Sequence, residues 1–410
     1  MSQTVLIATL WVCLAAVVYA YAGYPLLVFV LARLFGKRQE PEFLPDDQLP
    51  TLSLLIAAYN EEAVIGERIE NALALDYPAE RLEIVVATDG CSDRTAEIVR
   101  GYADRGVRLL EYRQRRGKAT VLNNSLPQLR GQVVMFSDAN TFNQPDAGRR
   151  LVRWFCDPTV VAVCGRLILT DPASGRNSDG LYWQYETFIK HQEGRLGVLL
   201  GANGGIYALR RDAYVPIPND TILDDLVIPL LSRLQHGGKI VYDLTAVAHE
   251  ETPPDIRAEF HRRSRIGAGG FGSVPLLAGL LNPLSGWVFF TFVSHKLLRW
   301  CGPFFLLGLL FTSVLLADQP LYRGLLLAQG VFYLTALVAT YLPGRSRVCR
   351  LLRLTSMFVG MNGALLLGFF RWLRHGQNTC WKRTARLGEA QAGLVVNVEP
   401  RAVVENVGGS

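Results

Sequence analysis

The chain has 410 residues, half of them hydrophobic, and a formal net charge of +6. This length exceeds the roughly 100 to 200 residues of one ordinary domain, so we expect a soluble domain with additional segments. The apolar residues are concentrated at the two ends, while 40–265 have the composition of a soluble domain. The basic residues crowd around the apolar segments, which favours contact with anionic lipid headgroups and argues against a nucleic-acid partner. The seven cysteines are scattered and form no C-x-x-C pair, so neither a disulfide framework nor a zinc site is supported.

The first 32 residues carry no charged side chain, and Arg33, Lys37 and Arg38 follow them. A membrane-spanning helix needs about 20 apolar residues. A secretory signal would carry its positive charge before the apolar run, not after it. We therefore predict a retained transmembrane anchor over 1–35. Because Lys and Arg favour the cytoplasmic side, the N-terminus should lie outside and the central domain in the cytoplasm.

The segment 36–50 is rich in proline and acidic residues, as a linker is. Beyond it, short apolar runs without polar alternation predict strands of a parallel sheet buried on both faces: 51–60, 82–90, 107–112, 132–140 and 160–169. Helical stretches lie between them, at 61–75, 92–105 and 145–155, with Ser92 or Asp93 as an N-cap and Pro145 as a first helical residue. This alternation predicts a doubly wound α/β domain over 51–268.

The chain turns apolar again after the central domain. Residues 271–295 are interrupted by Pro275 and Pro283, so we expect a pair of interfacial helices within 269–300. Two spans are predicted at 301–317 and 324–343, joined by a short outer loop.

A further apolar segment, 354–370, has arginines on both sides. Since both flanks favour the cytoplasm, an interfacial or re-entrant segment is favoured over a true span. The region 301–375 is thus predicted to be transmembrane or re-entrant, and 376–410 a cytoplasmic, disordered tail. Together these features predict a multi-pass protein of the cell inner (cytoplasmic) membrane.

Polar residues follow the predicted strands, where ligands of doubly wound sheets bind. Metal-assisted sugar transfer needs a carboxylate to hold a divalent cation with the diphosphate, and a second carboxylate as base near the acceptor hydroxyl. Each aspartate also has a simpler interpretation, as a turn residue (Asp89), a helix cap (Asp138) or a negative charge at a helix N-terminus (Asp224 and Asp225). Their joint arrangement in one α/β domain between membrane segments favours the catalytic interpretation.

Several motifs occur in order: LLIAAYNEE, VVATDGCSDRT, RGKATVLN, VVMFSDAN, GANGGIYALRR and ILDDLVIPL, with SHKLLRW at 294–300. As a set they resemble family 2 glycosyltransferases, in the branch of the cellulose, hyaluronan and poly-N-acetylglucosamine synthases. The resemblance covers roughly residues 50–300. It implies a GT-A fold and inverting transfer from UDP-sugars or related donors, with Mg²⁺ or Mn²⁺ as cofactor.

The resemblance also implies site residues. Asp225 would be the general base, and Asp138 would bind metal and diphosphate with Asn140 as a further metal ligand. The donor nucleotide would contact Tyr59, Asn60, Glu61, Asp89, Lys118, Asp138 and Arg265, and the acceptor side would comprise Gly204, Gly205 and Asp224. Lys118 could instead be an exposed lysine at a helix start, and the two glycines could belong to a turn.

Two positions depart from the family pattern. The D-x-D motif reads Asp138-Ala139-Asn140, so its second acid is a neutral amide. Where processive members carry Q-x-x-R-W, this chain has Arg262, Arg265 and Ile266. Arg265 can still pair with phosphate, but the aromatic platform for an acceptor sugar is missing, and Arg262 with Arg263 could face lipid phosphates.

We therefore expect a glycosyltransferase that makes surface polysaccharide or exopolysaccharide at the cytoplasmic membrane face, alone or in a synthesis or export complex. Its partners would be a nucleotide-sugar donor, a saccharide or lipid-linked acceptor and membrane lipids. One alternative is transfer of a single sugar to a polyprenyl-phosphate or lipid-linked acceptor. Another is a catalytically weak nucleotide-sugar-binding scaffold of a polysaccharide complex.

Overall fold

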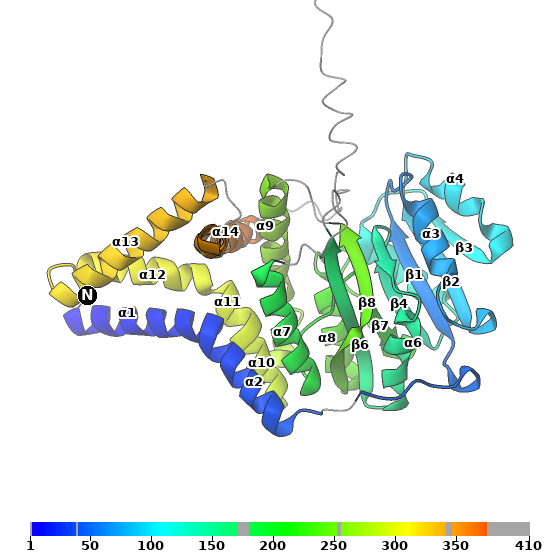
Figure 1. The fold of residues 1–410 in the computed structure, drawn as a ribbon, viewed down its shortest axis with the longest axis horizontal. Coiled ribbons are helices and arrows are strands. Elements are labelled where there is room, and N and C mark those ends of the chain that lie inside the picture. Colours follow the sequence, from blue (N-terminus) through cyan, green and yellow to red (C-terminus); the bar gives the residue numbers. More distant parts are fainter. Residues whose placement is uncertain (1, 38–39, 171–179, 252–255, 342–346, 375–410) are drawn as a thin grey trace, which may run out of the picture.

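The computed structural model describes residues 2–37, 40–170, 180–251, 256–341 and 347–374. An α/β domain stands beside a group of long helices formed by both ends of the chain (Figure 1). The predicted tail, 376–410, lies outside the described residues.

One mixed sheet forms the centre of the α/β domain, in the order β3-β2-β1-β4-β7-β6-β8-β5. Its strands are β1 (Leu52–Ala58), β2 (Leu82–Asp89), β3 (Val107–Tyr112), β4 (Val133–Asp138), β5 (Thr141–Asn143), β6 (Val160–Thr170), β7 (Tyr207–Arg210) and β8 (Lys239–Glu251). Strands β3, β2, β1 and β4 are parallel, while β7 is antiparallel to both β4 and β6. The five predicted strands are therefore confirmed and run in one direction, but β7 separates β6 from the other four.

Three strands were missed by the sequence analysis: β5, β7 and β8. The longest, β8, pairs in parallel with β6 and antiparallel with β5. It contains Asp243, whose charge interrupts the apolar run from which a buried strand is predicted. That carboxylate is fully buried and is paired at 2.8 Å with Arg153, so tertiary contacts satisfy a residue that local pattern would exclude from a strand.

Helices cover both faces of the sheet, as predicted for a doubly wound domain (Figure 1). Successive residues of β1 point to opposite faces: Leu54 and Ile56 join the core under α3 and α6, and Leu55 joins the core under α5 and α8. The domain helices are α3 (Ile65–Leu73), α4 (Thr95–Arg100), α5 (Lys118–Ser125), α6 (Ala147–Val152), α7 (Leu181–Arg195) and α8 (Asp224–His236). Short 3-10 turns lie at Asp46–Gln48, Ala79–Arg81, Ala103–Arg105, Leu126–Gln128, Arg153–Cys156 and Arg211–Ala213.

Two predicted helix starts differ from the observed ones by one or two residues. Helix α4 begins at Thr95 after Arg94, one residue later than an N-cap at Asp93 predicts, but Asp93 still caps the first turn because its Oδ1 accepts from the Thr95 amide at 3.0 Å. Helix α6 begins at Ala147 after Asp146, so Pro145 lies before the helix and is not its first residue.

The N-terminal apolar segment is one continuous helical rod: α1 (Gln3–Val18), a π-helical turn (Tyr19–Gly23) and α2 (Tyr24–Phe35). The rod changes direction near the π-helical turn (Figure 1), as such turns commonly cause. Helix α2 packs on α7 of the α/β domain, where Tyr24 donates a hydrogen bond of 2.6 Å to Glu193. The N-terminal rod is thus attached to the domain by side-chain contacts as well as by the chain.

The segment after the anchor follows the domain surface. Arg153 donates to Glu40 at 2.6 Å and to the Pro41 carbonyl at 3.2 Å, and Leu49 is 1% exposed. These contacts hold much of the proline-rich linker against the α/β domain.

The C-terminal helices are α9 (Ile256–Ser273), α10 (Trp287–Thr291), α11 (Leu298–Trp300), α12 (Gly302–Leu315), α13 (Pro320–Tyr341) and α14 (Arg347–Leu373), with 3-10 turns at Ala278–Leu281 and Pro283–Ser285 and a π-helical turn at Phe292–Leu297. The prediction of one helix pair over 271–295 is wrong. Helix α9 runs to Ser273, and Pro275 and Pro283 separate it from α10 by two short turns. Pro275 lies just beyond the end of α9, where a helix cannot readily continue because proline lacks the amide hydrogen that the helix needs.

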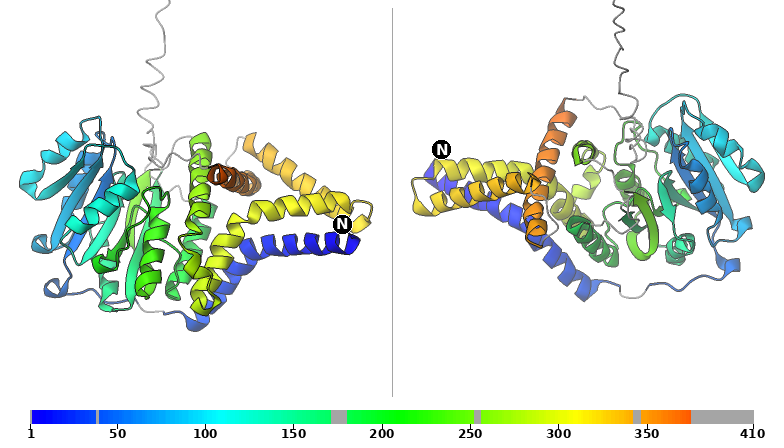
Figure 2. Two further views of the ribbon diagram at one scale, coloured as in Figure 1. Left: turned by 180° about the vertical axis from the view of Figure 1, so that it is seen from behind. Right: turned by 45° about the horizontal axis from the view of Figure 1, so that its top comes forward.

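Three described helices are long and apolar enough to cross a membrane: Gln3–Phe35, Pro320–Ala339 and Leu352–Leu373. Trp287–Trp300 with Gly302–Leu315 passes the same test as a pair bent by 57°. Helices α1, α12 and α13 lie side by side and form what we call the helical arm, with the N-terminus and the α12–α13 turn at its far tip (Figures 1 and 2).

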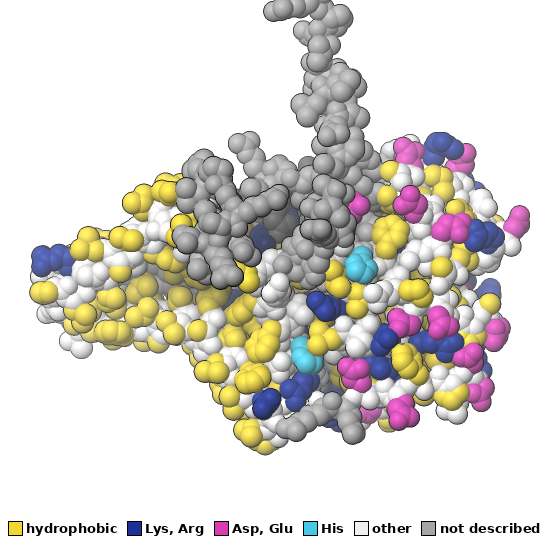
Figure 3. Space-filling model, viewed as in Figure 1, with side chains coloured by type: hydrophobic (Ala, Val, Ile, Leu, Met, Phe, Trp, Pro, Cys, Tyr) yellow, Lys and Arg dark blue, Asp and Glu magenta, His cyan; other side chains and the backbone are white. Residues whose placement is uncertain are grey.

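Hydrophobic side chains cover the visible face of the helical arm, whereas charges of both signs are spread over the α/β domain (Figure 3). Helix α14 crosses the arm: it is seen almost end-on in Figure 1, where the arm helices lie in the plane of the picture. The exposed apolar arm indicates membrane association.

Candidate active site

The carboxyl ends of the parallel strands bring three of the predicted loops together. Asp138 ends β4 opposite Ala57 of β1, and Thr88 of β2 lies opposite Ala58. Parallel strands in register place their following loops at one edge of the sheet, which we call the donor edge.

At the donor edge Lys118 joins two aspartates that are far apart in the sequence. Its Nζ lies 2.8 Å from Oδ1 of Asp138 and 3.1 Å from Oδ2 of Asp224. Burial lowers the pKa of the Lys118 ammonium, but the carboxylates of Asp138 and Asp224 outweigh this and hold the pKa above its ordinary value. Lys118 is therefore a charged member of the site and not an exposed lysine at a helix start.

Asp225 faces the same space from the first turn of α8. A Cβ on Gly204 would meet Oδ2 of Asp138 at 3.5 Å and Oδ2 of Asp225 at 3.6 Å, so Gly204 lies between the two carboxylates. Burial and the neighbouring Asp224 raise the pKa of Asp225 above its usual range. A carboxylate with a raised pKa beside other charged side chains is a candidate general base.

Gly204 and Gly205 form a turn between Asn203 and Ile206, whose amide donates to the Asn203 carbonyl at 2.9 Å. The two glycines differ in surroundings. Gly204 faces the carboxylates, whereas a Cβ on Gly205 would come within 2.6 Å of Thr141 Oγ1. Gly205 therefore allows close packing against β5.

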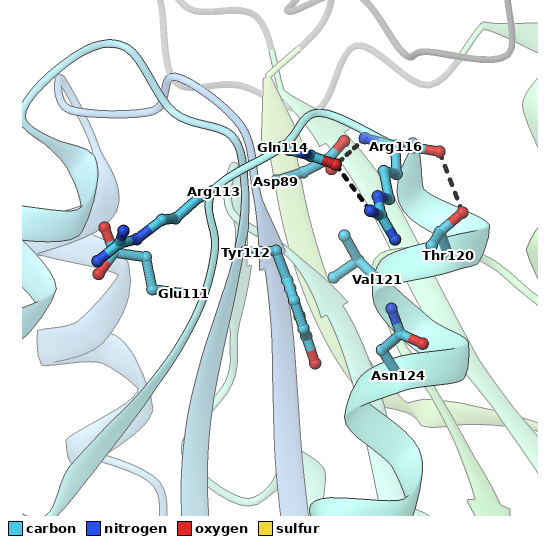
Figure 4. A pocket seen from close by; sticks show the side chains of 9 residues that line it. All are labelled: Asp89, Glu111, Tyr112, Arg113, Gln114, Arg116, Thr120, Val121 and Asn124. Atoms are coloured by element: carbon cyan, nitrogen blue, oxygen red, sulfur yellow. Dashed lines mark hydrogen bonds between the residues drawn. The ribbon is translucent and has the colours of Figure 1, made fainter.

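Asp89 is only 1% exposed and holds the loop that leads to Lys118. Its Oδ1 accepts from the Arg116 amide at 2.7 Å, and its Oδ2 accepts from the Gly117 amide at 2.9 Å. A pocket of about 310 Å³ adjoins this loop at the end of β3 (Figure 4), with Asp89, Tyr112 and Arg116 among its lining residues. Its size is at the small end of ligand pockets, which range over about 300 to 1,000 Å³.

Hydrogen bonds connect the loop after β1 to the loop after β2. Asn60 adopts a left-handed conformation with φ of 53°, and its side chain exchanges hydrogen bonds with Ser92, at 3.0 Å to the hydroxyl and 2.9 Å from the amide. The Glu61 amide donates to Thr95 Oγ1 at 2.8 Å. The guanidinium of Arg115 lies over the ring of Tyr59, 3.9 Å from its centroid. The structure thus places all three predicted residues at the donor edge and shows that Asn60 also shapes it.

Asn140 lies beside a carboxylate that the sequence analysis missed. Its Nδ2 donates to Oε1 of Glu250, the penultimate residue of β8, at 3.3 Å. Burial and the charge of Asp138 raise the pKa of Glu250 to about 7. The amide at the second position of the D-x-D motif therefore has an acid next to it.

The residues at this edge fit a divalent cation only in part. Asp138 and Asn140 offer oxygen ligands, which hard cations prefer. Within the described part of the chain, however, no group of three or more His, Cys, Asp or Glu side chains could hold a metal ion. The protein would thus supply few ligands, and a cation there would depend on diphosphate oxygens and water.

Helix α9 brings Arg265 to the site. Burial lowers the pKa of this guanidinium, and the charges of Asp224, Asp225 and Asp138 oppose that effect, which places Arg265 among the carboxylates. A Cβ on Gly269 of the same helix would meet Ile222 at 2.9 Å, so α9 packs directly on the segment before Asp224.

Two further residues lie at the site but were not among the predicted site residues. Lys190 of α7 donates to Asn203 at 2.6 Å, and its charge lowers the pKa of Asp225. Tyr207 is fully buried and stacks on Phe136 with 4.5 Å between ring centroids. Lys190 is an ordinary helix residue and Tyr207 lies within the GANGGIYALRR motif, but only the fold brings them under the carboxylates.

A mixed α/β sheet with aspartates at its carboxyl edge is the architecture of GT-A glycosyltransferases. The structure superposes on mannosyltransferase PcManGT from Pyrobaculum calidifontis, solved in complex with GDP-Man and Mn²⁺, with a TM-score of 0.67, 22% sequence identity, and coverage of 91% of this chain and 100% of that one. A model of glycosyl transferase family 2 matches residues 53–216. Residues 53–216 are thus a family 2 glycosyltransferase domain.

Among the curated proteins that are similar in sequence, two illustrate the range. The chain is 28% identical over 274 residues to the beta-monoglucosyldiacylglycerol synthase of Synechocystis, with 64% of this chain and 57% of that protein aligned. It is 28% identical over 231 residues to the poly-beta-1,6-N-acetyl-D-glucosamine synthase of Staphylococcus aureus, with 55% of each aligned. The chain therefore spans somewhat more than half the length of the curated relatives that it matches.

Proposed function

We propose that the protein is an inverting glycosyltransferase, which moves a sugar from a nucleotide-diphosphate donor, UDP-linked in our proposal, to an acceptor hydroxyl at the cytoplasmic membrane face. The observation that carries the proposal is the pair of carboxylates, Asp138 and Asp225, that face each other across Gly204. One lies where a diphosphate would bind and the other where an acceptor would enter.

In this reaction Asp225 takes the proton from the acceptor hydroxyl as its oxygen attacks the anomeric carbon. A raised pKa suits that role because a base whose pKa is nearer the working pH accepts the proton more readily. Lys118 and Arg265 contribute positive charge where the departing nucleoside diphosphate becomes more negative. The pocket beside Asp89 and the ring of Tyr59 would receive the nucleotide.

Mg²⁺ or Mn²⁺ would be held by Asp138 and Asn140. The solved structure of PcManGT contains Mn²⁺, which supports divalent-metal use by this fold. When bound, the cation would offset negative charge on the diphosphate. Lys118 already occupies one oxygen of Asp138, so the side chain and the cation would share this carboxylate.

The helical arm supports a multi-pass arrangement in the inner membrane. The 22 residues of α13 extend about 33 Å at 1.5 Å per residue, enough for a hydrocarbon core of about 30 Å. If the arm helices cross the bilayer, α14 lies along its surface, because it runs across them (Figure 2). That orientation favours an interfacial α14. Arg33 and Lys37, which follow the first apolar segment, favour an N-terminus outside and an α/β domain in the cytoplasm.

The acceptor is proposed to be a growing saccharide or a lipid-linked molecule. The similarity to the poly-N-acetylglucosamine synthase supports a growing saccharide, and the similarity to the glucosyldiacylglycerol synthase supports a lipid-linked acceptor. Addition of a single sugar to a lipid acceptor is the second candidate, and Ile266 favours it because an aliphatic side chain stands where processive enzymes carry tryptophan.

The deciding experiment incubates detergent-solubilised protein with a panel of nucleotide sugars, lipid acceptors and Mn²⁺ or Mg²⁺. Released nucleoside diphosphate and product length are measured together, with Asp225→Asn as the inactive control. Release above this control supports a transferase, and a product that never exceeds one added sugar selects the lipid acceptor over the polymer. Metal-dependent donor binding without any release would instead indicate a scaffold.

A further inference from the structure

Arg68 of α3 is a fully buried arginine with an unusual set of partners. Its side chain is 0% exposed, yet none of the ion pairs recorded among the described residues includes it. Buried charges in proteins are normally paired or bonded to polar groups, since leaving water is costly. The partners of this guanidinium therefore indicate what it does.

One arm of the guanidinium reaches the residue before Asp138. Nη2 of Arg68 donates to Ser137 Oγ at 3.1 Å, and that hydroxyl donates to the Gly205 carbonyl at 2.9 Å. The contact joins the end of β4 to the turn that contains Gly204.

The other arm reaches the strand that follows Asn140. Nη1 of Arg68 donates to Asn71 Oδ1 at 3.1 Å. Asn71 in turn bonds both backbone groups of Asn143: its Oδ1 accepts from the Asn143 amide and its Nδ2 donates to the Asn143 carbonyl, each at 2.9 Å. The segment 137–143 is thus held at both ends by one guanidinium, directly at Ser137 and through Asn71 at Asn143.

The charge of Arg68 acts on the same segment. Burial lowers the pKa of Arg68, and the negative charge of Asp138 is the influence that opposes it. The positive charge of Arg68 therefore lies close enough to Asp138 to interact with its carboxylate.

We propose that Arg68 is a positioning residue of the donor site, which holds Asp138 and Asn140 in the geometry that binds a divalent cation with a nucleoside diphosphate. The inference rests on the proposed function, in which this pair receives the cation. Residues behind metal ligands typically change metal affinity by about 10 to 100-fold when they are replaced.

The test compares Arg68→Gln with Arg153→Gln, a matched control. Arg153 is also buried and bonded to polar partners, but it joins the linker to β8 and lies outside the donor site. Binding of UDP and GDP to the purified full-length protein is measured by calorimetry with Mn²⁺ and with a chelator. The unfolding temperature of each variant is measured as well.

We expect Arg68→Gln to weaken Mn²⁺-dependent nucleotide binding about tenfold or more while binding in chelator changes little. Arg153→Gln should lower the unfolding temperature and leave Mn²⁺-dependent binding by the folded protein unchanged. Equal affinity in Arg68→Gln and wild type would overturn the proposal, as would equal losses in the two variants.

A second variant, Asn71→Ala, keeps the guanidinium and breaks only its connection to Asn143. It should give a smaller loss of Mn²⁺-dependent affinity, and it decides the question if Arg68→Gln does not fold. Unchanged affinity in a folded Asn71→Ala variant would then overturn the proposal. If the wild-type protein binds neither nucleotide with Mn²⁺, the proposed function itself fails, which is a different result from a variant that matches the wild type.

Discussion

The ammonium group of Lys118 lies 2.8 Å from Oδ1 of Asp138 and so occupies part of the space where a cation would bind. It also lies 3.1 Å from Asp224, so this one positive charge offsets two carboxylates. The protein therefore keeps its donor edge partly neutralised without a metal.

Replacing Lys118 should show this compensation. Lys118→Met leaves Asp138 and Asp224 without this partner, and we expect the free energy of unfolding to fall by about 1 to 3 kcal/mol. The loss should be smaller than for a fully buried ion pair because these side chains are partly exposed to water. Because Mn²⁺ can replace the missing charge, it should raise the unfolding temperature more in this variant than in wild type. Thermal unfolding with and without Mn²⁺ measures both effects, and an equal Mn²⁺ response in the two proteins contradicts the compensation.

Loss of the proposed base should separate chemistry from binding. Asp225→Asn should reduce kcat by about 10² to 10⁴-fold, the usual contribution of a general base. Binding of UDP, measured by calorimetry, should stay close to the wild-type value because Asp225 acts on the acceptor. Unchanged turnover in this variant would exclude Asp225 as the base.

Loss of the proposed metal ligand should instead affect binding of the donor nucleotide. Asp138→Ala should weaken UDP binding in the presence of Mn²⁺, while binding in chelator should change little. If the wild-type protein binds UDP equally well with and without chelator, the metal has no part in donor binding.

The pH dependence of catalysis should reflect the aspartate pair. Since a raised pKa delays deprotonation, the acid limb of kcat/KM should lie above the ordinary aspartate value of about 3.9. Asp224→Asn removes a neighbouring negative charge that raises the pKa of Asp225, so the limb should move to lower pH. Asp157→Asn, at a surface ion pair with Lys37, serves as the control and should leave the limb in place. A limb unmoved in Asp224→Asn would show that the pair is not coupled.

The junction between α14 and α9 should be sensitive to a single methyl group. A Cβ on Gly368 would lie 2.8 Å from both the Ser264 carbonyl and the Ala268 amide, whereas Gly363 on the same helix has nothing within 4 Å. Gly368→Ala should therefore displace α14 from α9, lower the unfolding temperature and reduce turnover because α9 carries Arg265. Gly363→Ala should match wild type in both measurements, and equal behaviour of the two variants would show that the close contact is unimportant.

The sequence predicted the elements that local pattern governs. Buried parallel strands read as continuous apolar runs, so β1, β2, β3, β4 and β6 were found, and the loops after β1, β2 and β4 pointed to Tyr59, Asp89 and Asp138. Apolar segments of sufficient length similarly indicated the helical arm. These features depend on residues that are close in the chain.

The tertiary structure decided what depends on distant residues. β8 was missed because Asp243 needs Arg153, 90 residues earlier, to be satisfied inside the sheet. Lys118, Asp138 and Asp224 meet only because α5, β4 and α8 converge on one edge, and Arg68 has no motif because its partners are one serine and one asparagine side chain. A side chain's charge and hydrogen-bond partners are set by packing between elements, so the aspartates and Lys118 could be read from the sequence motifs while Arg68 behind them could not.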